Sequence, residues 1–337
     1  MKRPYSFSAT IFFLLLFIWH NSSQARTEKI TIGYSALGPT QTSIWIPKES
    51  RSFEKYGLDV TLVLINGGLR TIQSLIAGDI SFAHAGGEAA LVANLKGADT
   101  TIIATNEPIL TYKLIGRKIK SLDELKRATS GLKLGIQSFG SMDDFVARKM
   151  AALLGLSLGK DIILVAGGQA TERLAALSKG LIDLSVMKTA LPTRMLKGGF
   201  HVLFDMTTEA SFPYHGMGLS TKRELVRRNP DLVRSVIKAY VEGIKIYKTD
   251  AEFSAKVRAK YTRRSDMDEL QEEWRMYVDV VPKMPYPTID GIKAMLADLS
   301  SSFSEARKTD AARYYDDSFV RELEVSGFIN NLYRPGR

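Results

Sequence analysis

The sequence predicts an α/β protein built from two similar halves, each a mainly parallel β-sheet flanked by helices, followed by a helical C-terminal part. Three observations support this prediction. Segments with strand character alternate with amphipathic helices over short connections, which is typical of βαβ units and a parallel sheet. The order of strand, glycine turn and helix starts again in the middle of the chain. The length of 337 residues is also enough for two domains.

The first half begins with an expected strand over residues 29–35, along which apolar side chains alternate. The following loop leads into an expected helix over residues 43–56, with Ser43 as its N-cap and Gly57 just after its end. The remaining expected elements are strands at 58–65, 80–84 and 100–105, and helices from the Gly67-Gly68 turn to residue 77 and from the Gly86-Gly87 turn to residue 95.

The second half repeats this layout after a polar connection over residues 117–129. Its expected strands are 132–136, 162–166, 182–187 and 201–204. Its expected helices are 142–154, a helix from the Gly167-Gly168 turn to residue 178, and a short helix between the last two strands. The residues of the two halves do not match well, so the repeat is one of architecture.

Beyond Tyr214 the chain is expected to become helical. Thr221 and Glu224 have the spacing of a capping box, and Asn229 followed by Pro230 is typical of a helix start. Seven residues then form one apolar stripe: Leu232, Val233, Val236, Ile237, Tyr240, Val241 and Ile244. Further helices are expected at 267–280, 289–299 and 317–325, with a frayed tail from residue 330.

The N-terminus has the three parts of a secretory signal peptide. Lys2 and Arg3 are followed by the apolar run of residues 9–19 and by small residues up to Ala25. A membrane anchor is the alternative, but spanning a bilayer takes roughly 20 apolar residues and this run is shorter. We therefore expect cleavage near Ala25 and a soluble, monomeric mature protein in the periplasm, or outside the cell where there is no outer membrane.

Composition limits the chemistry that this protein can perform. The chain has no cysteine, which excludes disulfides, thiolate metal sites, a cysteine nucleophile and a lipid-anchored N-terminus. The four histidines lack metal-ligand spacing, and neither a Gly-x-Ser-x-Gly elbow nor a phosphate loop occurs. His84 ends an expected strand and is interpreted as a core residue. The sequence therefore predicts no metal, no cofactor and no catalytic residues.

The net charge of +10 raises the question of nucleic-acid binding. Residues 222–264 contain 13 Lys or Arg and 5 Asp or Glu, so this one segment carries most of the excess. We interpret it as a solvated helical face and expect no nucleic-acid partner, because an exported protein seldom meets nucleic acid.

Glycine-bearing turns follow several of the expected strands in both halves. In an open parallel sheet, ligands bind at the carboxyl ends of the strands. Glycine allows close backbone approach there, and free N–H groups at a helix start favour anionic or acceptor groups. A single such turn needs no ligand to explain it. Five at matching positions predict a shared cleft: Gly38, Gly67-Gly68, Gly86-Gly87, Gly140 and Gly167-Gly168.

The sharpest local signal is the turn QSFGSMDD after the first strand of the second half. Ser138 and Ser141 are candidate hydroxyl donors to a ligand, and Phe139 is a candidate packing surface. The alternative for Ser141 is a helix N-cap. Asp143 and Asp144 are expected only to interact with the helix dipole.

Five further residues are candidates in the predicted cleft or hinge. Gln41 is expected to face the cleft from the equivalent turn of the first half. Glu88 could pair with a ligand amine, although a surface carboxylate in the first helical turn is the favoured interpretation. Lys188 could neutralise an anion, and Tyr214 with His215 could line the hinge. The full predicted ligand-binding set is Ser35, Gly38, Gln41, Thr42, Gly67, Gly68, Gly86, Gly87, Glu88, Ser138, Phe139, Gly140, Ser141, Gly168, Lys188 and Tyr214.

Two groups of motifs resemble a known family. The first group lies at Lys48-Glu49, Phe53 to Val60 and Ala77 to Asp79. The second comprises Gly140-Ser141, Asp144, Gly155-Leu156, Asp161, Gly167-Gly168, Ala176-Leu177, Gly180 and Asp183. Together they resemble substrate-binding proteins in the nitrate, sulfonate and thiamine-precursor (taurine-like) group of ABC importers. The resemblance covers about residues 29–204.

The resemblance implies a two-lobed periplasmic-binding-protein-like fold of type II, with the C-terminal helices on lobe 1. It divides the chain into a signal peptide (1–25), the first part of lobe 1 (26–110), lobe 2 (111–210) and a return to lobe 1 (211–337). It also implies capture of a small, acceptor-rich or anionic molecule by lobe closure and delivery to an ABC permease.

Two alternatives remain open. One is a periplasmic ligand-sensing module for a membrane receptor. The other is an enzyme similar to the thiamine-pyrimidine synthases, which the signal peptide and the lack of cysteine disfavour.

Overall fold

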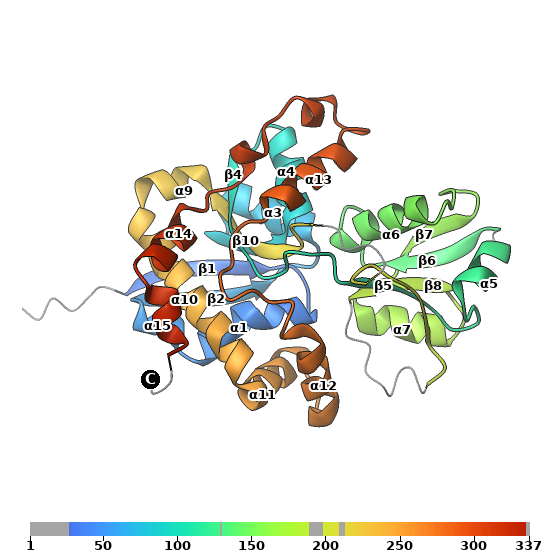
Figure 1. The fold of residues 1–337 in the computed structure, drawn as a ribbon, viewed down its shortest axis with the longest axis horizontal. Coiled ribbons are helices and arrows are strands. Elements are labelled where there is room, and N and C mark those ends of the chain that lie inside the picture. Colours follow the sequence, from blue (N-terminus) through green and yellow to red (C-terminus); the bar gives the residue numbers. More distant parts are fainter. Residues whose placement is uncertain (1–26, 129, 189–197, 209–212, 335–337) are drawn as a thin grey trace, which may run out of the picture.

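The computed structural model describes residues 27–128, 130–188, 198–208 and 213–334. Within these residues the chain forms two lobes, each with a five-stranded β-sheet flanked by helices. Figure 1 shows the lobes side by side, with the C-terminal helices gathered on the first lobe. The predicted two-lobed α/β fold is confirmed. The predicted signal peptide and the short helix expected between the strands at 182–187 and 201–204 lie outside the described residues.

The sheet of the first lobe has the strand order β2-β1-β3-β10-β4. Its strands are β1 (Glu28–Tyr34), β2 (Leu58–Leu64), β3 (Phe82–Gly86), β4 (Thr100–Thr105) and β10 (Met217–Lys222). Strand β1 pairs in parallel with β2 and β3, whereas β10 runs antiparallel to β3 and β4. Because parallel strands end at one edge of a sheet, the turns after β1, β2 and β3 meet there.

Strand β10 corrects the expectation that the chain becomes helical beyond Tyr214. It lies between β3 and β4, with Met217 opposite Gly86. A central strand buried on both faces shows no polar alternation, so its sequence gives little strand signal. The expected capping box is also wrong. Thr221 belongs to β10 and donates its hydroxyl to the carbonyl of Ser81 at 2.8 Å.

The second lobe has the strand order β7-β6-β8-β5-β9. Its strands are β5 (Tyr112–Gly116), β6 (Leu132–Ile136), β7 (Ile162–Ala166), β8 (Leu184–Lys188) and β9 (His201–Asp205). Strand β6 is parallel to β7 and β8, and β5 is antiparallel to β8 and β9. The sequence did not predict β5. The expected polar connection contains a helix, α5 (Leu122–Arg127), which Ser121 caps by accepting the N–H of Glu124 at 3.2 Å.

The helices that follow the strands mostly occupy the expected residues: α3 (Gly68–Ala77), α4 (Gly87–Leu95), α6 (Met142–Leu153) and α7 (Ala170–Ser178). The helix expected at 43–56 is instead two helices, α1 (Thr42–Glu49) and α2 (Ser52–Lys55). Arg51 separates them in the left-handed conformation, with φ 62°, which a right-handed helix cannot contain. Ser43 lies inside α1 rather than at its N-cap, and its hydroxyl donates to the carbonyl of Thr40 at 3.0 Å.

Helix α10 (Pro230–Thr249) organises the core of the first lobe. Its predicted apolar stripe is buried, and Asn229 accepts the N–H of Leu232 at 3.1 Å as the predicted N-cap. Gly243 allows α10 to approach α1 closely, because a Cβ there would lie 2.3 Å from Cγ of Pro47. The stripe and the cap are therefore confirmed.

The remaining C-terminal elements cover the first lobe: α9 (Arg223–Arg228), α11 (Ala251–Thr262), α12 (Met267–Tyr277), α13 (Ile289–Leu299), η2 (Ser304–Arg307), η3 (Ala311–Tyr314), α14 (Ser318–Val325) and α15 (Phe328–Leu332). Contrary to the expected frayed tail, α15 runs to Leu332 and packs on the core through Ile329, which is 1% exposed. None of the described helices is long and apolar enough to cross a membrane.

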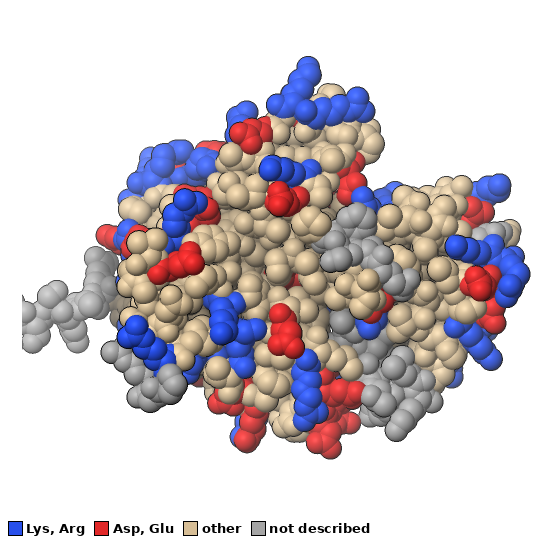
Figure 2. Space-filling model, in the orientation of Figure 1, with Lys and Arg blue, Asp and Glu red and all other residues tan. Residues whose placement is uncertain are grey.

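Charged side chains of both signs are scattered over the molecular face shown in Figure 2, and Lys and Arg form no continuous band across it. Several cations of the basic segment 222–264 pair with carboxylates. Arg223 contacts Asp99, Arg234 contacts Glu322 and Lys260 contacts Glu49. These pairs agree with the interpretation of the segment as a solvated helical face, except at Arg258, which is 7% exposed and lines a cavity described below.

Two antiparallel segments connect the lobes. The first follows the end of β4 at Thr105 and runs through Glu107, and the second returns from Pro213 to β10. The N–H of Tyr214 donates to the carbonyl of Pro108 at 3.0 Å, and that of Gly216 to the carbonyl of Glu107 at 2.9 Å. Only these paired segments carry the chain between the lobes within the described residues, so they form a hinge next to the cleft.

Candidate functional site

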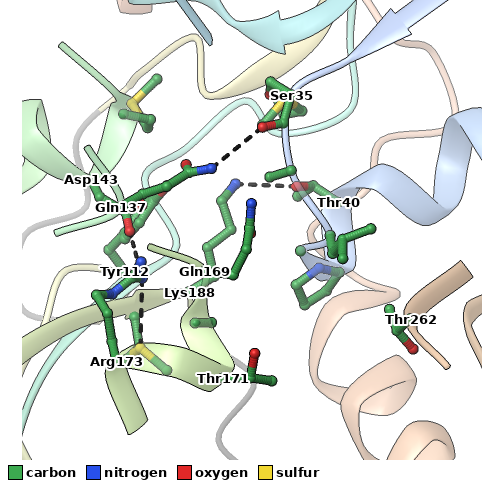
Figure 3. A pocket seen from close by; sticks show the side chains of 18 of the residues that line it. Ser35, Thr40, Tyr112, Gln137, Asp143, Gln169, Thr171, Arg173, Lys188 and Thr262 are labelled. Atoms are coloured by element: carbon green, nitrogen blue, oxygen red, sulfur yellow. Dashed lines mark hydrogen bonds and ion pairs between the residues drawn. The ribbon is translucent and has the colours of Figure 1, made fainter. Parts of the chain in front are cut away.

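A cavity of about 420 Å³ lies between the two lobes. Its walls come from the segments that follow β1, β2, β3, β6 and β7, from the end of β8, and from the region of helices α11 and α12. Figure 3 shows polar side chains of both lobes directed toward this space. A volume of this size suits a small organic molecule.

The wall from lobe 1 is mainly backbone and small side chains. Ser35 follows β1, and Gly38 begins the turn that leads through Thr40 to α1. Gly68 opens α3, and Gly86 precedes α4. These residues, which have small side chains or none, line the cavity on the side of lobe 1.

The wall from lobe 2 combines amides with one strong ion pair. Gln137 follows β6 and reaches the carbonyl of Ser35 in lobe 1, at 3.5 Å. Arg173 of α7 pairs with Asp143 of α6 at 2.5 Å, and both side chains are nearly buried. Asp143 therefore does more than complement the helix dipole, contrary to expectation. No sequence pattern marked Arg173 as a site residue.

Helices α11 and α12 supply a third wall that the sequence did not predict. Arg258 pairs with Glu273 at 2.6 Å, and Arg264 contacts Glu273 at 2.6 Å and Glu269 at 3.1 Å. Glu269 lies in the first turn of α12, but no local pattern relates these residues to the strand ends, because they are distant in the chain. Thr262 lies beside them and is labelled in Figure 3.

Lys188 lines the cavity, but its charge is already compensated. Its Nζ forms an ion pair with Glu107 and donates to Thr40 at 3.2 Å. Glu107 is fully buried and also accepts the hydroxyls of Thr111 and, at 2.9 Å, Tyr277. The sequence did not identify Glu107, because a single carboxylate in a loop gives no motif.

Glu88 lies in the first turn of α4 and lines the cavity. Burial, and secondarily the nearby Asp144 carboxylate, raise the pKa of Glu88 to about 7. Among the residues that the structure describes, no cation forms an ion pair with it. Its carboxyl group is therefore not simply a solvated surface group.

Several predicted site residues lie behind the cavity wall. Gln41 is fully buried, and its amide contacts Nδ1 of His84 at 2.6 Å and the hydroxyl of Ser35 at 3.3 Å. His84 is a core residue, as interpreted, with Nε2 3.1 Å from the hydroxyl of Tyr240. Burial lowers the pKa of His84 to about 3, so the ring is neutral. Thr42 is buried on the far side of η1 (Pro39–Gln41), and Tyr214 is buried in the hinge.

The turn after β6 faces lobe 1 at the rim of the cavity. Ser141 caps α6 by accepting the N–H of Asp144 at 3.4 Å, which is its alternative role. Phe139 is 59% exposed. Ser138 lies across the gap from Gly67, with its Oγ 3.4 Å from where a Cβ of that glycine would be.

The structure thus separates the predicted set into two groups. Six of the residues line the cavity: Ser35, Gly38, Gly68, Gly86, Glu88 and Lys188. Ten lie at its rim, in the hinge or behind its wall: Gln41, Thr42, Gly67, Gly87, Ser138, Phe139, Gly140, Ser141, Gly168 and Tyr214.

The lobes also contact each other beside the cavity. Gln169 of lobe 2 donates to Asn66 of lobe 1 at 2.7 Å. Lys149 of α6 pairs with Asp298 of α13 at 2.6 Å. Contacts of this kind form when two lobes approach and break when they separate, so this arrangement can enclose a ligand.

Comparisons with known proteins agree with this architecture. The family model described as NMT1/THI5 like matches residues 41–252. A search of curated proteins found no match to the sequence.

Among solved structures, a Bordetella bronchiseptica RB50 protein is 19% identical with a TM-score of 0.77, covering 89% of this chain and 98% of its own. The periplasmic nitrate-binding protein NrtA from Synechocystis PCC 6803 is 13% identical with a TM-score of 0.74, and the match covers 92% of this chain and 91% of NrtA. The alkanesulfonate-binding protein SsuA from Xanthomonas axonopodis pv. citri is 19% identical with a TM-score of 0.65, and the match covers 83% of this chain and 93% of SsuA. At these identities the likeness shows a shared fold.

Proposed function

This chain belongs to the NMT1/THI5-like family, and from that premise we propose that it is the solute-binding component of an ABC importer. It captures a small organic molecule between its lobes and delivers it to a membrane permease. The observation that supports this role best is the cavity between two lobes joined by only two hinge segments in the described part of the chain. The folds of the nitrate-binding and alkanesulfonate-binding neighbours add support.

The mechanism is closure of two rigid lobes about the hinge. Ligand atoms that contact both walls stabilise the closed state by their differential affinity for it. Ser35 and Gly86 contribute from lobe 1, and Gln137 and Gln169 from lobe 2. The permease then recognises the closed protein in the periplasm, to which the signal peptide predicted from the sequence would export it.

The cations that line the cavity and the two buried histidines of lobe 1 and the hinge do not form a catalytic arrangement in the described part of the chain. The cations that line it in the described residues are held in ion pairs with carboxylates. His84 and His215 are buried, and burial lowers the pKa of each to about 3. They are therefore poorly suited to act as general bases near neutral pH.

The test is to purify the mature protein from the periplasm and identify the molecules that it carries by native mass spectrometry. The recovered molecule should raise the unfolding temperature saturably, with about 2.7 kcal/mol of stabilisation at one hundred times its Kd. Solution scattering should show a decrease in the radius of gyration. Chemical conversion of the bound molecule, or export to another compartment, would contradict the proposal.

A further inference from the structure

Among the described residues that line the cavity, one carboxylate has no cationic partner. Four cations line the cavity in the described residues, and each has a carboxylate partner. The pairs are Arg173 with Asp143, Lys188 with Glu107, and Arg258 and Arg264 with Glu273 and Glu269. An anionic ligand would have to displace one of these carboxylates to obtain a cation.

Glu88 is the lining carboxylate for which the described residues supply no cation. It lies where α4 of lobe 1 meets α6 of lobe 2. A Cβ on Gly86 would be only 2.6 Å from Cε of Met142, which shows how closely the two helix starts approach. Across this junction Asp144 is a second carboxylate, which repels the charge of Glu88, and the nearby Arg148 is paired with Asp144 at 2.8 Å.

Three of the helix starts at the cavity offer little additional attraction for an anion, whereas the first turn of α3, which opens at Gly68, carries no acidic side chain. Those of α4, α6 and α7 already carry acidic side chains in their first turns, namely Glu88, Asp143 with Asp144, and Glu172. Ser141 caps α6, and Glu172 accepts the N–H of Gln169 at 2.6 Å. Carboxylates at these positions match the positive ends of the helix dipoles.

We propose, building on the solute-binding role above, that the ligand carries a cationic nitrogen group, such as a protonated amine or amidine, which binds the carboxylate of Glu88. The pairing leaves the existing ion pairs of the cavity intact. The rest of the ligand packs against thioethers and aliphatic side chains that line the cavity: Leu37, Met142, Leu174, Met187 and Met217. The ligand is therefore an amine with an apolar body rather than a simple anion.

The direct test uses probes that differ only in their charged group. The 2-phenylethyl and n-butyl bodies are each offered as amine, alcohol, carboxylate and sulfonate, and binding is measured by calorimetry at pH 8 up to millimolar concentration. We expect the amines alone to bind. Glu88→Gln should weaken amine binding at least tenfold, whereas Glu88→Asp should retain part of it. Glu305→Gln, a change of an exposed carboxylate on η2, is the matched control and should have no effect.

Molecules carried over from expression provide an independent measurement. A retained molecule with a basic nitrogen that is lost in Glu88→Gln, by native mass spectrometry, supports the proposal. A retained sulfonate or carboxylate without basic nitrogen, or amine binding unchanged in Glu88→Gln, overturns the proposal but leaves solute binding intact. Failure of every probe and every carried-over molecule to bind wild-type protein overturns both this proposal and the solute-binding role.

Discussion

Lys188 at the end of β8 in lobe 2 forms an ion pair with Glu107, which lies where the chain leaves lobe 1. Glu107 is fully buried and Lys188 nearly so. The pair joins the floor of the cavity to the hinge, because the carbonyl of Glu107 also accepts the N–H of Gly216 in the returning segment. The side chains of Lys188 and Glu107 thus link a charged group of the cavity to the hinge segment.

The first prediction concerns this pair. Glu107→Gln should destabilise the protein by about 3–5 kcal/mol, because it leaves the ammonium of Lys188 without its buried counter-charge. The double change Glu107→Gln with Lys188→Met should recover a large part of that loss. Urea unfolding of the wild type, the two single variants and the double variant measures the coupling. Strictly additive effects would show that the two charges do not interact.

The second prediction concerns the pH dependence of stability. The pKa of Glu88 is raised to about 7, so the native state holds a proton that the unfolded state releases at its ordinary pKa near 4.5. Stability from this group is therefore present at low pH and lost as the pH rises through about 7, by at most roughly 3 kcal/mol. Glu88→Gln should abolish this loss.

The groups that face Glu88 do not confuse this measurement. Asp144 is a neighbouring carboxylate present in both proteins, Tyr214 stays neutral because burial holds its pKa well above 10, and His215 stays neutral because burial lowers its pKa to about 3. The difference in unfolding free energy between wild type and Glu88→Gln is measured from pH 4.5 to pH 8 without ligand. A difference that does not change with pH would contradict the assignment.

The third prediction links the same titration to binding. A cationic ligand binds the ionised form of Glu88, so the affinity for 2-phenylethylamine should increase from pH 5 to pH 8. The slope should approach tenfold per pH unit below about 7 and level off above it, since the amine itself stays protonated throughout. Calorimetry in Glu88→Gln should show weak binding with a flat profile. Affinity that falls with rising pH would refute cation binding at this carboxylate.

The fourth prediction concerns the packing of α10 on α1. Gly243→Ala would place a Cβ 2.3 Å from Cγ and 2.6 Å from Cδ of Pro47, so the helices must move apart. We expect a loss of about 1–3 kcal/mol in unfolding free energy. Adding Pro47→Ala should relieve the clash and recover part of the loss in thermal unfolding. Equal stability of wild type and Gly243→Ala would show that the contact is not tight.

The fifth prediction uses the absence of native cysteine. Asn66→Cys with Gln169→Cys places two thiols where side chains of opposite lobes now share a 2.7 Å hydrogen bond. A short thiol-specific crosslinker should then hold the lobes together and slow ligand exchange at least tenfold by stopped-flow fluorescence. The uncrosslinked variant and each single variant serve as controls. Exchange at the wild-type rate after complete crosslinking would argue against lobe opening as the route of entry.

Local sequence patterns were sufficient to predict an element when its buried residues recur at a regular spacing along the chain. The apolar stripe of α10 predicted its buried face, and Asn229 with Pro230 predicted its start. Strands β4, β6 and β7 occupy the predicted residues. Their signals are short in range, because side chains three, four or two residues apart share a face.

Sequence patterns did not predict strands that are buried on both faces, or side chains whose contacts are distant in the chain. Strand β10 is a central strand without polar alternation. Strand β5 directly precedes a polar connection, and the sequence pattern did not separate the two. Gln41 appeared free in the sequence, but His84 and Ser35 hold its amide inside lobe 1. Such contacts join residues that share no sequence pattern.

The sequence by itself determined the fold class, the repeat of two α/β halves and the placement of glycine turns at the strand ends, because each of these is encoded by neighbouring residues. Only the tertiary structure decided the charge of the cavity. That charge depends on pairings such as Lys188 with Glu107 and Arg173 with Asp143, which cross between elements. Electrostatic compensation acts through space rather than along the chain, so no local pattern could reveal that Glu88 alone lacks a counter-charge among the described cavity residues.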